Sequence, residues 1–330
     1  MDFSYLIKKI TDSPIINYPF QHIQINDLFE PEDFEKILNS SDIKLAPCNS
    51  DKALFDELLK SAYRIIEFPG CTTDMNEYIQ WHKTKSSVKK TTASCSTNTS
   101  CESFGTVLRL TTPATDIIKC LQNFLMSEEF VNCISKKFNI ENKSCNYDAG
   151  IQKYLDGYEI SPHPDIRRKA LTYMVNINSA PNSENQNHHT SYLQFKDQFS
   201  YVKNFWEGNE KFNRCWVPWE WCDIKKQQTE NNSIVIFSPS NETMHAVKAD
   251  YDHLTHQRTQ LYGNLWYKEC QVESMPNWEQ LLLPMNIESR DQNSKNNMAD
   301  NFKSFIPFKV KSLFKKHTAV TSGTHLDRKT

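Results

Sequence analysis

The 330-residue sequence lacks the features that are typical of membrane proteins, nucleic-acid-binding proteins and proteins secreted through a signal peptide. No apolar run approaches the roughly 20 residues that a transmembrane helix needs, and the N-terminal stretch has no long apolar signal core. Lys and Arg number 38 against 40 Asp and Glu, and this near balance predicts no general attraction to nucleic acid or acidic membranes. We therefore expect a cytoplasmic protein.

Paired cysteine spacings and internal repeats are also missing. The ten cysteines follow neither a metal-type spacing nor a disulfide framework, so we expect reduced, mostly buried thiols. A chain of this length can bury a large core, and barrel domains of this size often form a single domain. The sequence therefore predicts one catalytic-sized domain over about residues 1–285.

Hydrophobic periodicity divides this domain into a helical support, about residues 1–145, and a strand-rich barrel core, about residues 146–270. A polar stretch within the helical support, residues 83–103, is predicted to be a loop. Helices are predicted at residues 31–39, at residues 51–68, and as two short helices on either side of Ser127 within residues 115–139.

Residues 286–330 differ in character from the rest of the chain. A polar linker leads into the basic amphipathic segment FKSFIPFKVKSLFKKH, residues 302–317. Such a segment either contacts a membrane surface or partner, or docks its phenylalanines on the barrel with its lysines in water. Pro307 interrupts any helix there, which favours the docked tail.

The sequence His163-Pro164-Asp165 has the pattern of a metal site. Side chains two positions apart on a strand point to the same face, so His163 and Asp165 can bind one ion. A histidine from another strand would complete a set of two histidines and one carboxylate. That set binds non-haem iron(II) and leaves coordination positions open for chemistry.

The third ligand is expected near the end of the apolar stretch NSIVIFSPSNETMHAV, residues 232–247. We prefer His245, because it follows this predicted strand directly. His253 and His256 are the alternatives, and both lie closer to Arg258, which begins the predicted last strand. On that strand His256 would share a face with Arg258, which leaves it poorly placed to act from the preceding loop.

These motifs, in this order, resemble the prolyl-4-hydroxylase-like branch of the iron(II)/2-oxoglutarate dioxygenases. The resemblance spans most of the chain from about Tyr18 to Lys268 and implies a mainly β fold with N-terminal helices (α+β), whose core is a distorted double-stranded β-helix, or jelly roll. The positions that carry it are Tyr154-x-x-Gly157, His163-x-Asp165, the apolar strand before His245, and Arg258.

The resemblance also implies the cofactors and their ligands. Fe(II) would be bound by His163, Asp165 and His245, with 2-oxoglutarate and O2 as co-substrates. The distal carboxylate of 2-oxoglutarate would pair with Arg258, whose planar guanidinium suits a carboxylate better than a lysine does.

Five further residues are candidates with alternative explanations. Tyr154 and Thr172 are predicted to give hydroxyl groups to bound 2-oxoglutarate, and otherwise are ordinary strand residues. Arg167 and Arg168 follow the metal motif and are candidates for pairing with a substrate carboxylate or phosphate, the alternative being a solvated turn. Trp206 belongs to an aromatic-rich insertion that either covers the pocket or packs on the barrel.

We therefore predict an oxidoreductase that hydroxylates a C–H bond of a small, anionic or amino-acid-like substrate, releasing succinate and CO2. Oxidative cyclisation or desaturation of an amino-acid-derived precursor is the alternative by the same chemistry. A non-catalytic jelly-roll binding module is the alternative of another class, and it predicts damage to the metal motif or to Arg258 that the sequence does not show. A cupin-like metalloprotein that does not use 2-oxoglutarate is a third alternative, and it would leave Arg258 without a role. The sequence does not predict an oligomeric state.

Overall fold

The structure is a computed structural model that describes residues 2–85 and 101–272, which lie within one compact unit, Met1–Leu281. The predicted basic tail therefore lies outside the described residues, as does most of the predicted polar loop. Within the described ranges no helix is long and apolar enough to cross a bilayer. Every cysteine in these ranges carries a free thiol, and none of them is fully exposed.

Most helices lie in the first part of the chain, and strands dominate from Cys145 onward. The helices are α1 Tyr5–Asp12, α2 Pro31–Asn39, α3 Asp51–Lys60, α4 Met75–Thr84, α5 Asp116–Leu125, α6 Glu128–Lys137 and α7 Tyr201–Gly208. The strands are β1 Ile23–Ile25, β2 Tyr63–Ile65, β3 Val107–Leu110, β4 Cys145–Tyr154, β5 Glu159–His163, β6 Lys169–Asn176, β7 Thr190–Phe195, β8 Cys222–Gln227, β9 Ile234–Phe237, β10 His245–Lys248 and β11 Arg258–Tyr267.

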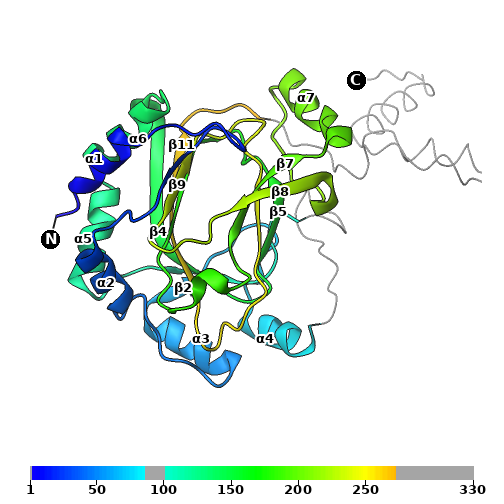
Figure 1. Cartoon of the computed structure of the whole chain (residues 1–330). Coiled ribbons are helices and arrows are strands. Elements are labelled where there is room, and N and C mark those ends of the chain that lie inside the picture. The colour runs from blue at the N-terminus through cyan, green and yellow to red at the C-terminus, as the bar shows by residue number, and fades with distance from the viewer. Residues whose placement is uncertain (1, 86–100, 273–330) are drawn as a thin grey trace, which may run out of the picture. The chain divides into compact units, whose positions relative to one another are not determined.

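The strands form two sheets. The large sheet has the order β1-β9-β6-β11-β4-β3-β2 and the small sheet has the order β5-β10-β7-β8. Helices α1, α2, α5 and α6 lie along one side of the large sheet, and the small sheet lies on its other side (Figure 1). The inner face of the large sheet therefore points toward the small sheet, as in two packed antiparallel layers.

Period-two alternation explains which face of the large sheet is which. On β6, Leu171, Tyr173 and Val175 pack into the core shared with α5 and α6. The intervening residues, such as Thr172 and Met174, point to the inner face. Residues on the helix side are apolar and residues on the inner face are largely polar. The large sheet therefore has a hydrophobic core on one face and a polar region on the face toward the small sheet.

The predicted helices at residues 31–39 and around Ser127 are confirmed. Pro31 is the first residue of α2, and the Ser127 hydroxyl accepts the N–H of Phe130 at 3.2 Å as the N-cap of α6. The predicted strand at Arg258 is also confirmed, because β11 has the expected bounds.

The single helix predicted over residues 51–68 is wrong beyond Lys60. There Ala62 adopts a φ of 61°, and Tyr63–Ile65 forms β2 against β3. A left-handed residue cannot continue a right-handed helix. The apolar residues that matched a helical period are thus divided between a helix and a short strand, whose pairing partner is distant in sequence.

Candidate metal centre and cavity

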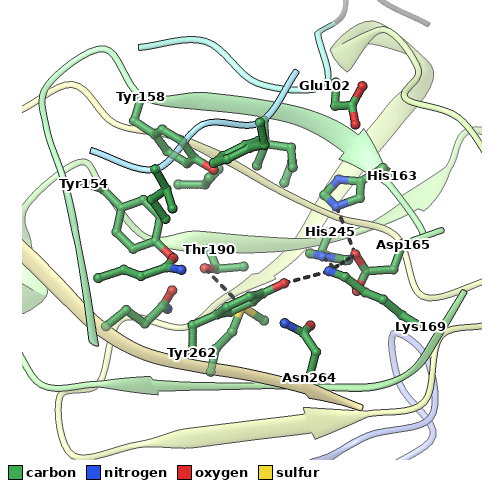
Figure 2. Close-up of a pocket in the computed structure, with 18 of the residues that line it drawn as sticks. Glu102, Tyr154, Tyr158, His163, Asp165, Lys169, Thr190, His245, Tyr262 and Asn264 are labelled. Atoms are coloured by element: carbon green, nitrogen blue, oxygen red, sulfur yellow. Dashed lines mark hydrogen bonds and ion pairs between the residues drawn. The ribbon is translucent and has the colours of Figure 1, made fainter. Parts of the chain in front are cut away.

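The small sheet brings the three predicted metal ligands together. His163 is the last residue of β5, and His245 is the first residue of β10, which pairs with β5 in a register that sets the two histidines opposite each other. Asp165 lies two positions beyond β5. All three side chains are buried, and their ligand atoms lie within 4.8 Å of one another. Figure 2 shows them gathered at one side of a pocket.

Backbone carbonyls orient both imidazoles. The Nδ1 of His163 lies 2.8 Å from the carbonyl oxygen of Ser161, and that of His245 lies 2.9 Å from the carbonyl of Thr243. A carbonyl only accepts, so each Nδ1 carries a proton, and each imidazole in its neutral form keeps the Nε2 lone pair. These Nε2 atoms lie 3.5 Å and 3.9 Å from the Asp165 carboxylate. Burial lowers the pKa of His245 to about 3, which keeps this imidazole neutral.

The Asp165 carboxylate is fixed at both oxygens. Lys169 donates to Oδ1 at 2.7 Å and Thr172 donates to Oδ2 at 2.7 Å. Burial alone would raise the pKa of Asp165, but the charge of Lys169 and the neighbouring histidines hold it well below its ordinary value. The backbone of Asp165 has a φ of 63°, a left-handed conformation that aspartate tolerates better than most residues. The site thus holds an oriented, anionic carboxylate.

Lys169 is itself held in place on the cavity wall. Its ammonium donates to the Tyr262 hydroxyl at 2.6 Å and lies 5.4 Å from the ring centroids of both Tyr262 and Trp266. Figure 2 shows this ammonium between the Tyr262 hydroxyl and Asp165. Burial opposes its charge, but Asp165 raises the pKa of Lys169 above its ordinary value. The ammonium therefore stays charged and bound to the carboxylate.

A cavity of about 390 Å³ connects this centre to Arg258. Arg258 begins β11, is buried, and donates from Nη2 to the Thr190 hydroxyl at 3.0 Å and to Gln260 at 3.4 Å. Its Nη1 is buried without a hydrogen-bond partner, and none of the described carboxylates forms an ion pair with it. Burial lowers the pKa of Arg258, yet a guanidinium remains charged in proteins. A buried cation with a free donor favours an anionic ligand.

Tyr154 lies beside this arginine, as expected. It faces Arg258 in the register of β4 with β11, and its ring centroid is 4.3 Å from the guanidinium carbon. The Tyr154 hydroxyl donates to the side chain of Gln152, and both residues line the cavity. Thr172, by contrast, is not among the cavity-lining residues. Its hydroxyl is used by Asp165, so it orients a predicted metal ligand rather than facing the predicted co-substrate.

The three predicted substrate contacts lie elsewhere. Arg167 donates to the backbone carbonyls of Phe212 and Trp206, so it anchors the aromatic insertion. Arg168 is exposed, and Trp206 is fully buried against Phe195. None of the three lines the cavity: Arg168 and Trp206 have the structural positions given as their alternatives, whereas Arg167 is part-buried and hydrogen-bonded to backbone and does not lie in a solvated turn. From the same insertion, Trp216 lines the cavity and stacks on His163 with ring centroids 5.9 Å apart.

Sequence reasoning missed the polar row on β11. Alternate residues of this strand line the cavity, and the period-two rule applied from Arg258 could have found them. Besides Arg258, which was predicted, they are Gln260, Tyr262, Asn264 and Trp266.

The alternative third ligand His253 belongs to a separate cluster. Its Nε2 lies 2.8 Å from Asp51, and its Nδ1 accepts the backbone N–H of Asp156 at 2.9 Å. His82 joins the same group, with its two ring nitrogens 3.0 Å from Asp51 and 3.1 Å from Asp156. The other alternative, His256, has its Nδ1 2.9 Å from the hydroxyl of Thr255.

Comparisons with known proteins give a likeness in structure alone. No family model matches the chain, and no curated protein matches it. A prolyl-4-hydroxylase from Pseudomonas putida is 9% identical, with 81% of this chain and 99% of that chain covered and a TM-score of 0.38. A Trichoplax adhaerens prolyl hydroxylase in complex with a hypoxia inducible factor peptide fragment is 10% identical, with coverage of 81% and 89% and a TM-score of 0.40.

A third similar structure is EvdO2 from Micromonospora carbonacea var. aurantiaca complexed with 2-oxoglutarate. It is 12% identical, covers 46% of this chain and 64% of that chain, and has a TM-score of 0.27. At such identities and TM-scores the likeness decides neither family nor activity, which depend on the chemistry of the cavity.

Proposed function

We propose that this chain is an iron(II)- and 2-oxoglutarate-dependent dioxygenase that oxidises a C–H bond of a small molecule, and that its two sheets form a distorted double-stranded β-helix. One observation carries the proposal. The cavity that receives two unprotonated Nε2 atoms and a fixed carboxylate also contains Arg258, a buried arginine with a free donor.

The donor set fits a divalent metal ion. His163 and His245 would each bind through Nε2, and Asp165 would bind through its carboxylate. The same residue types also bind zinc. The unpartnered Nη1 of Arg258 favours iron, because iron of this class uses an anionic co-substrate that needs a cation in the same cavity.

Iron(II) bound here would supply the oxidation: O2 and 2-oxoglutarate are converted to succinate and CO2 while one oxygen atom enters the substrate C–H bond. The chain's own residues bind and orient the reactants. Arg258 would pair with the distal carboxylate of 2-oxoglutarate, and the Tyr154 hydroxyl, which donates to Gln152 in this structure, would exchange that bond for one to the co-substrate. Burial of this wall excludes water and strengthens both interactions.

Hydroxylation of a small, anionic or amino-acid-like substrate is the proposed outcome. Cyclisation or desaturation of an amino-acid-derived precursor would use the same residues, since the outcome depends on how the substrate is held. A binding module without turnover is the alternative of another class, and the intact donor set and charged cavity argue against it. The cytoplasmic location and the domain limits of 1–285 stay predictions.

The test is the visible spectrum of anaerobic protein titrated first with iron(II) and then with 2-oxoglutarate. We expect a weak charge-transfer band in the wild-type protein and none in His245→Ala. A well-folded wild-type protein without the band would remove the co-substrate and leave the binding module as the better explanation.

Arg258 gives a second, quantitative test. We expect Arg258→Gln to raise the concentration of 2-oxoglutarate that half-saturates the band by about 10-fold to 100-fold, because a charged hydrogen bond worth about 1.5–3 kcal/mol is lost. Iron(II) affinity without co-substrate should stay near the wild-type value. An unchanged requirement for 2-oxoglutarate would assign its carboxylate to another cation.

A further inference from the structure

An ion pair lines the cavity at a place remote from Arg258. Arg109 of β3 donates from Nη1 and Nη2 to the two carboxylate oxygens of Asp148 on β4, at 2.9 Å and 3.0 Å. Asn264 lies opposite Asp148, six positions beyond Arg258 on β11, which is about 20 Å along the strand. Both members of the pair line the cavity and are partly exposed, 25% for Arg109 and 40% for Asp148.

The backbone is shaped to place this arginine. Arg109 lies opposite Gln152 in the register of β3 with β4, yet its guanidinium reaches Asp148, four positions further along β4. The side chain crosses Gly150 on the way, and a Cβ at that position would lie 2.9 Å from the Arg109 Nε. The glycine thus leaves room for an arginine lying along the strand. The Nε is buried and has no hydrogen-bond partner.

Strand register connects the pair to the metal centre. Asn264 lies opposite Asp148 on one side and opposite Thr172 on the other, so the three residues form one row across β4, β11 and β6. Thr172 donates to Asp165. Two strand spacings of about 4.8 Å each place Asp148 about 10 Å from the threonine that holds the metal-binding carboxylate. A small molecule can span that distance.

We propose, resting on the function proposed above, that Arg109 and Asp148 bind the charged head of a free α-amino acid, Arg109 its carboxylate and Asp148 its ammonium. A substrate with a carboxylate alone would face the Asp148 carboxylate, and one with an ammonium alone would face the guanidinium. Only a ligand that carries both charges can form a favourable ion pair with each of the two residues. Lys169 already pairs with Asp165, and Arg258 is assigned to the co-substrate, so neither competes for this head.

The placement also predicts which part of the amino acid is oxidised. With its head at the ion pair, the amino acid would extend its side chain toward Asp165 past an apolar wall formed by Trp216 and Trp266, which lie beside His163 and Lys169. The reacting C–H bond is therefore on the side chain and not at the α-carbon. An aliphatic side chain of several carbons suits both the distance and the wall.

Isothermal titration calorimetry of the anaerobic protein loaded with iron(II) and 2-oxoglutarate tests this, with each of the common free L-amino acids as the probe. We expect at least one with a long aliphatic side chain to bind. Its N-acetyl derivative and its methyl ester should each bind at least about 10-fold more weakly, because each removes one charge. Equal binding of the derivatives, or no binding by any free amino acid, overturns the proposal.

Variants of the pair assign each charge. Asp148→Asn should lose the discrimination against the N-acetyl derivative and keep that against the ester, and Arg109→Gln should do the reverse. Gly150→Ala should weaken binding of the free amino acid with both charges retained, since it displaces the arginine. Variants that discriminate like the wild-type protein overturn the assignment.

The charge-transfer band separates this proposal from the preceding one. It should persist in all three variants, which also shows that they are folded and loaded. If the band appears but no amino acid binds, the dioxygenase proposal stands and the proposal that Arg109 and Asp148 bind an amino-acid head is rejected. If the band is absent in wild-type protein, the dioxygenase proposal is rejected. Calorimetry on the metal-free protein then still reports whether the ion pair binds amino acids.

Discussion

Two clusters in this molecule contain two histidines and an aspartate, and they use these residue types in opposite ways. In the first, His163, Asp165 and His245, backbone carbonyls accept from each Nδ1, so both Nε2 lone pairs face the carboxylate. Three neighbouring ligand atoms are then available to a metal ion.

In the second cluster, Asp51, His82 and His253, a backbone N–H takes the place of a carbonyl. The N–H of Asp156 donates to the Nδ1 of His253, so its Nε2 carries the proton and donates to Asp51. Both nitrogens of His82 face carboxylates, which favours its doubly protonated form. With these protons in place no imidazole lone pair faces the centre, so we expect this cluster to join α3, α4 and two loops and not to bind a metal ion.

The difference teaches that residue type and spacing do not identify a histidine metal site. What decides is the backbone group that each ring meets, because it fixes which nitrogen carries the proton. A carbonyl that accepts from Nδ1 leaves the Nε2 lone pair available to a metal ion. An N–H that donates to Nδ1 occupies the Nδ1 lone pair and places the proton on Nε2.

The largest expected effect comes from removing the carboxylate in one cluster and not in the other. Asp165→Gly should weaken iron(II) binding by more than about 100-fold, since even partners of metal ligands are worth 10-fold to 100-fold. Glycine accepts the φ of 63° at this position, so the fold should persist. Equilibrium metal titration with a thermal unfolding control measures both.

The matched control is Asp51→Asn in the second cluster. It should leave iron(II) affinity and the charge-transfer band unchanged and lower the melting temperature. A fall in iron affinity comparable to that of Asp165→Gly would make the second cluster a metal site and break the comparison.

Loss of the hydrogen bond from Thr172 to the metal-binding carboxylate should give the next largest effect. Thr172→Val removes the hydroxyl that donates to Asp165 Oδ2 and should lower iron(II) affinity about 10-fold to 100-fold. Thr172→Ser keeps a hydroxyl and should restore most of it. If valine and serine behave alike, the hydrogen bond does not orient the carboxylate.

Local patterns in the sequence predicted what local geometry controls. The i, i+2 spacing of His163 and Asp165, the helices at Pro31 and around Ser127, and the bounds of β11 all follow from short-range periodicity. The inner-face position of Arg258 follows from the same strand.

Contacts between distant segments could not be read from these patterns. Asp51 meets His253 across 202 positions of sequence, and Arg109 meets Asp148 only after β3 pairs with β4. The roles of Thr172 and Trp206 were predicted less well for the same reason, because each depends on which residues pack against it. The helix predicted beyond Lys60 became a strand through its pairing with β3.

Removal of His82 should cost stability without affecting metal. His82→Gln removes the protonated imidazole that bridges Asp51 and Asp156, and we expect the free energy of unfolding to fall by about 2–4 kcal/mol. Urea unfolding of the metal-free protein measures the change. Lys85→Gln is the control: Lys85 also pairs with Asp156 but is 58% exposed, so its loss should cost under about 1 kcal/mol. Equal losses would show that simple surface charge, and not the buried bridge, stabilises this region.

The smallest expected effect is the contribution of the second cluster to the pH dependence of stability. Its hydrogen bond to Asp156, assisted by Asp51 against the opposing effect of burial, raises the pKa of His82 above the ordinary 6.5. The folded chain therefore holds this proton more tightly than the unfolded chain. The resulting stability is fully present below pH 6.5 and is lost as the pH rises through the folded pKa.

Urea unfolding at a series of pH values from 6 to 9 should show that the stability advantage of wild-type protein over His82→Gln shrinks as the pH rises. Asp156 works in the opposite window: burial opposes its charge, but hydrogen bonds from His82 and the Tyr251 N–H lower its pKa to about 2, so its contribution disappears only in strong acid. A wild-type profile parallel to that of His82→Gln would mean that His82 is not held protonated, and the contrast between the two clusters would then rest on His253 alone.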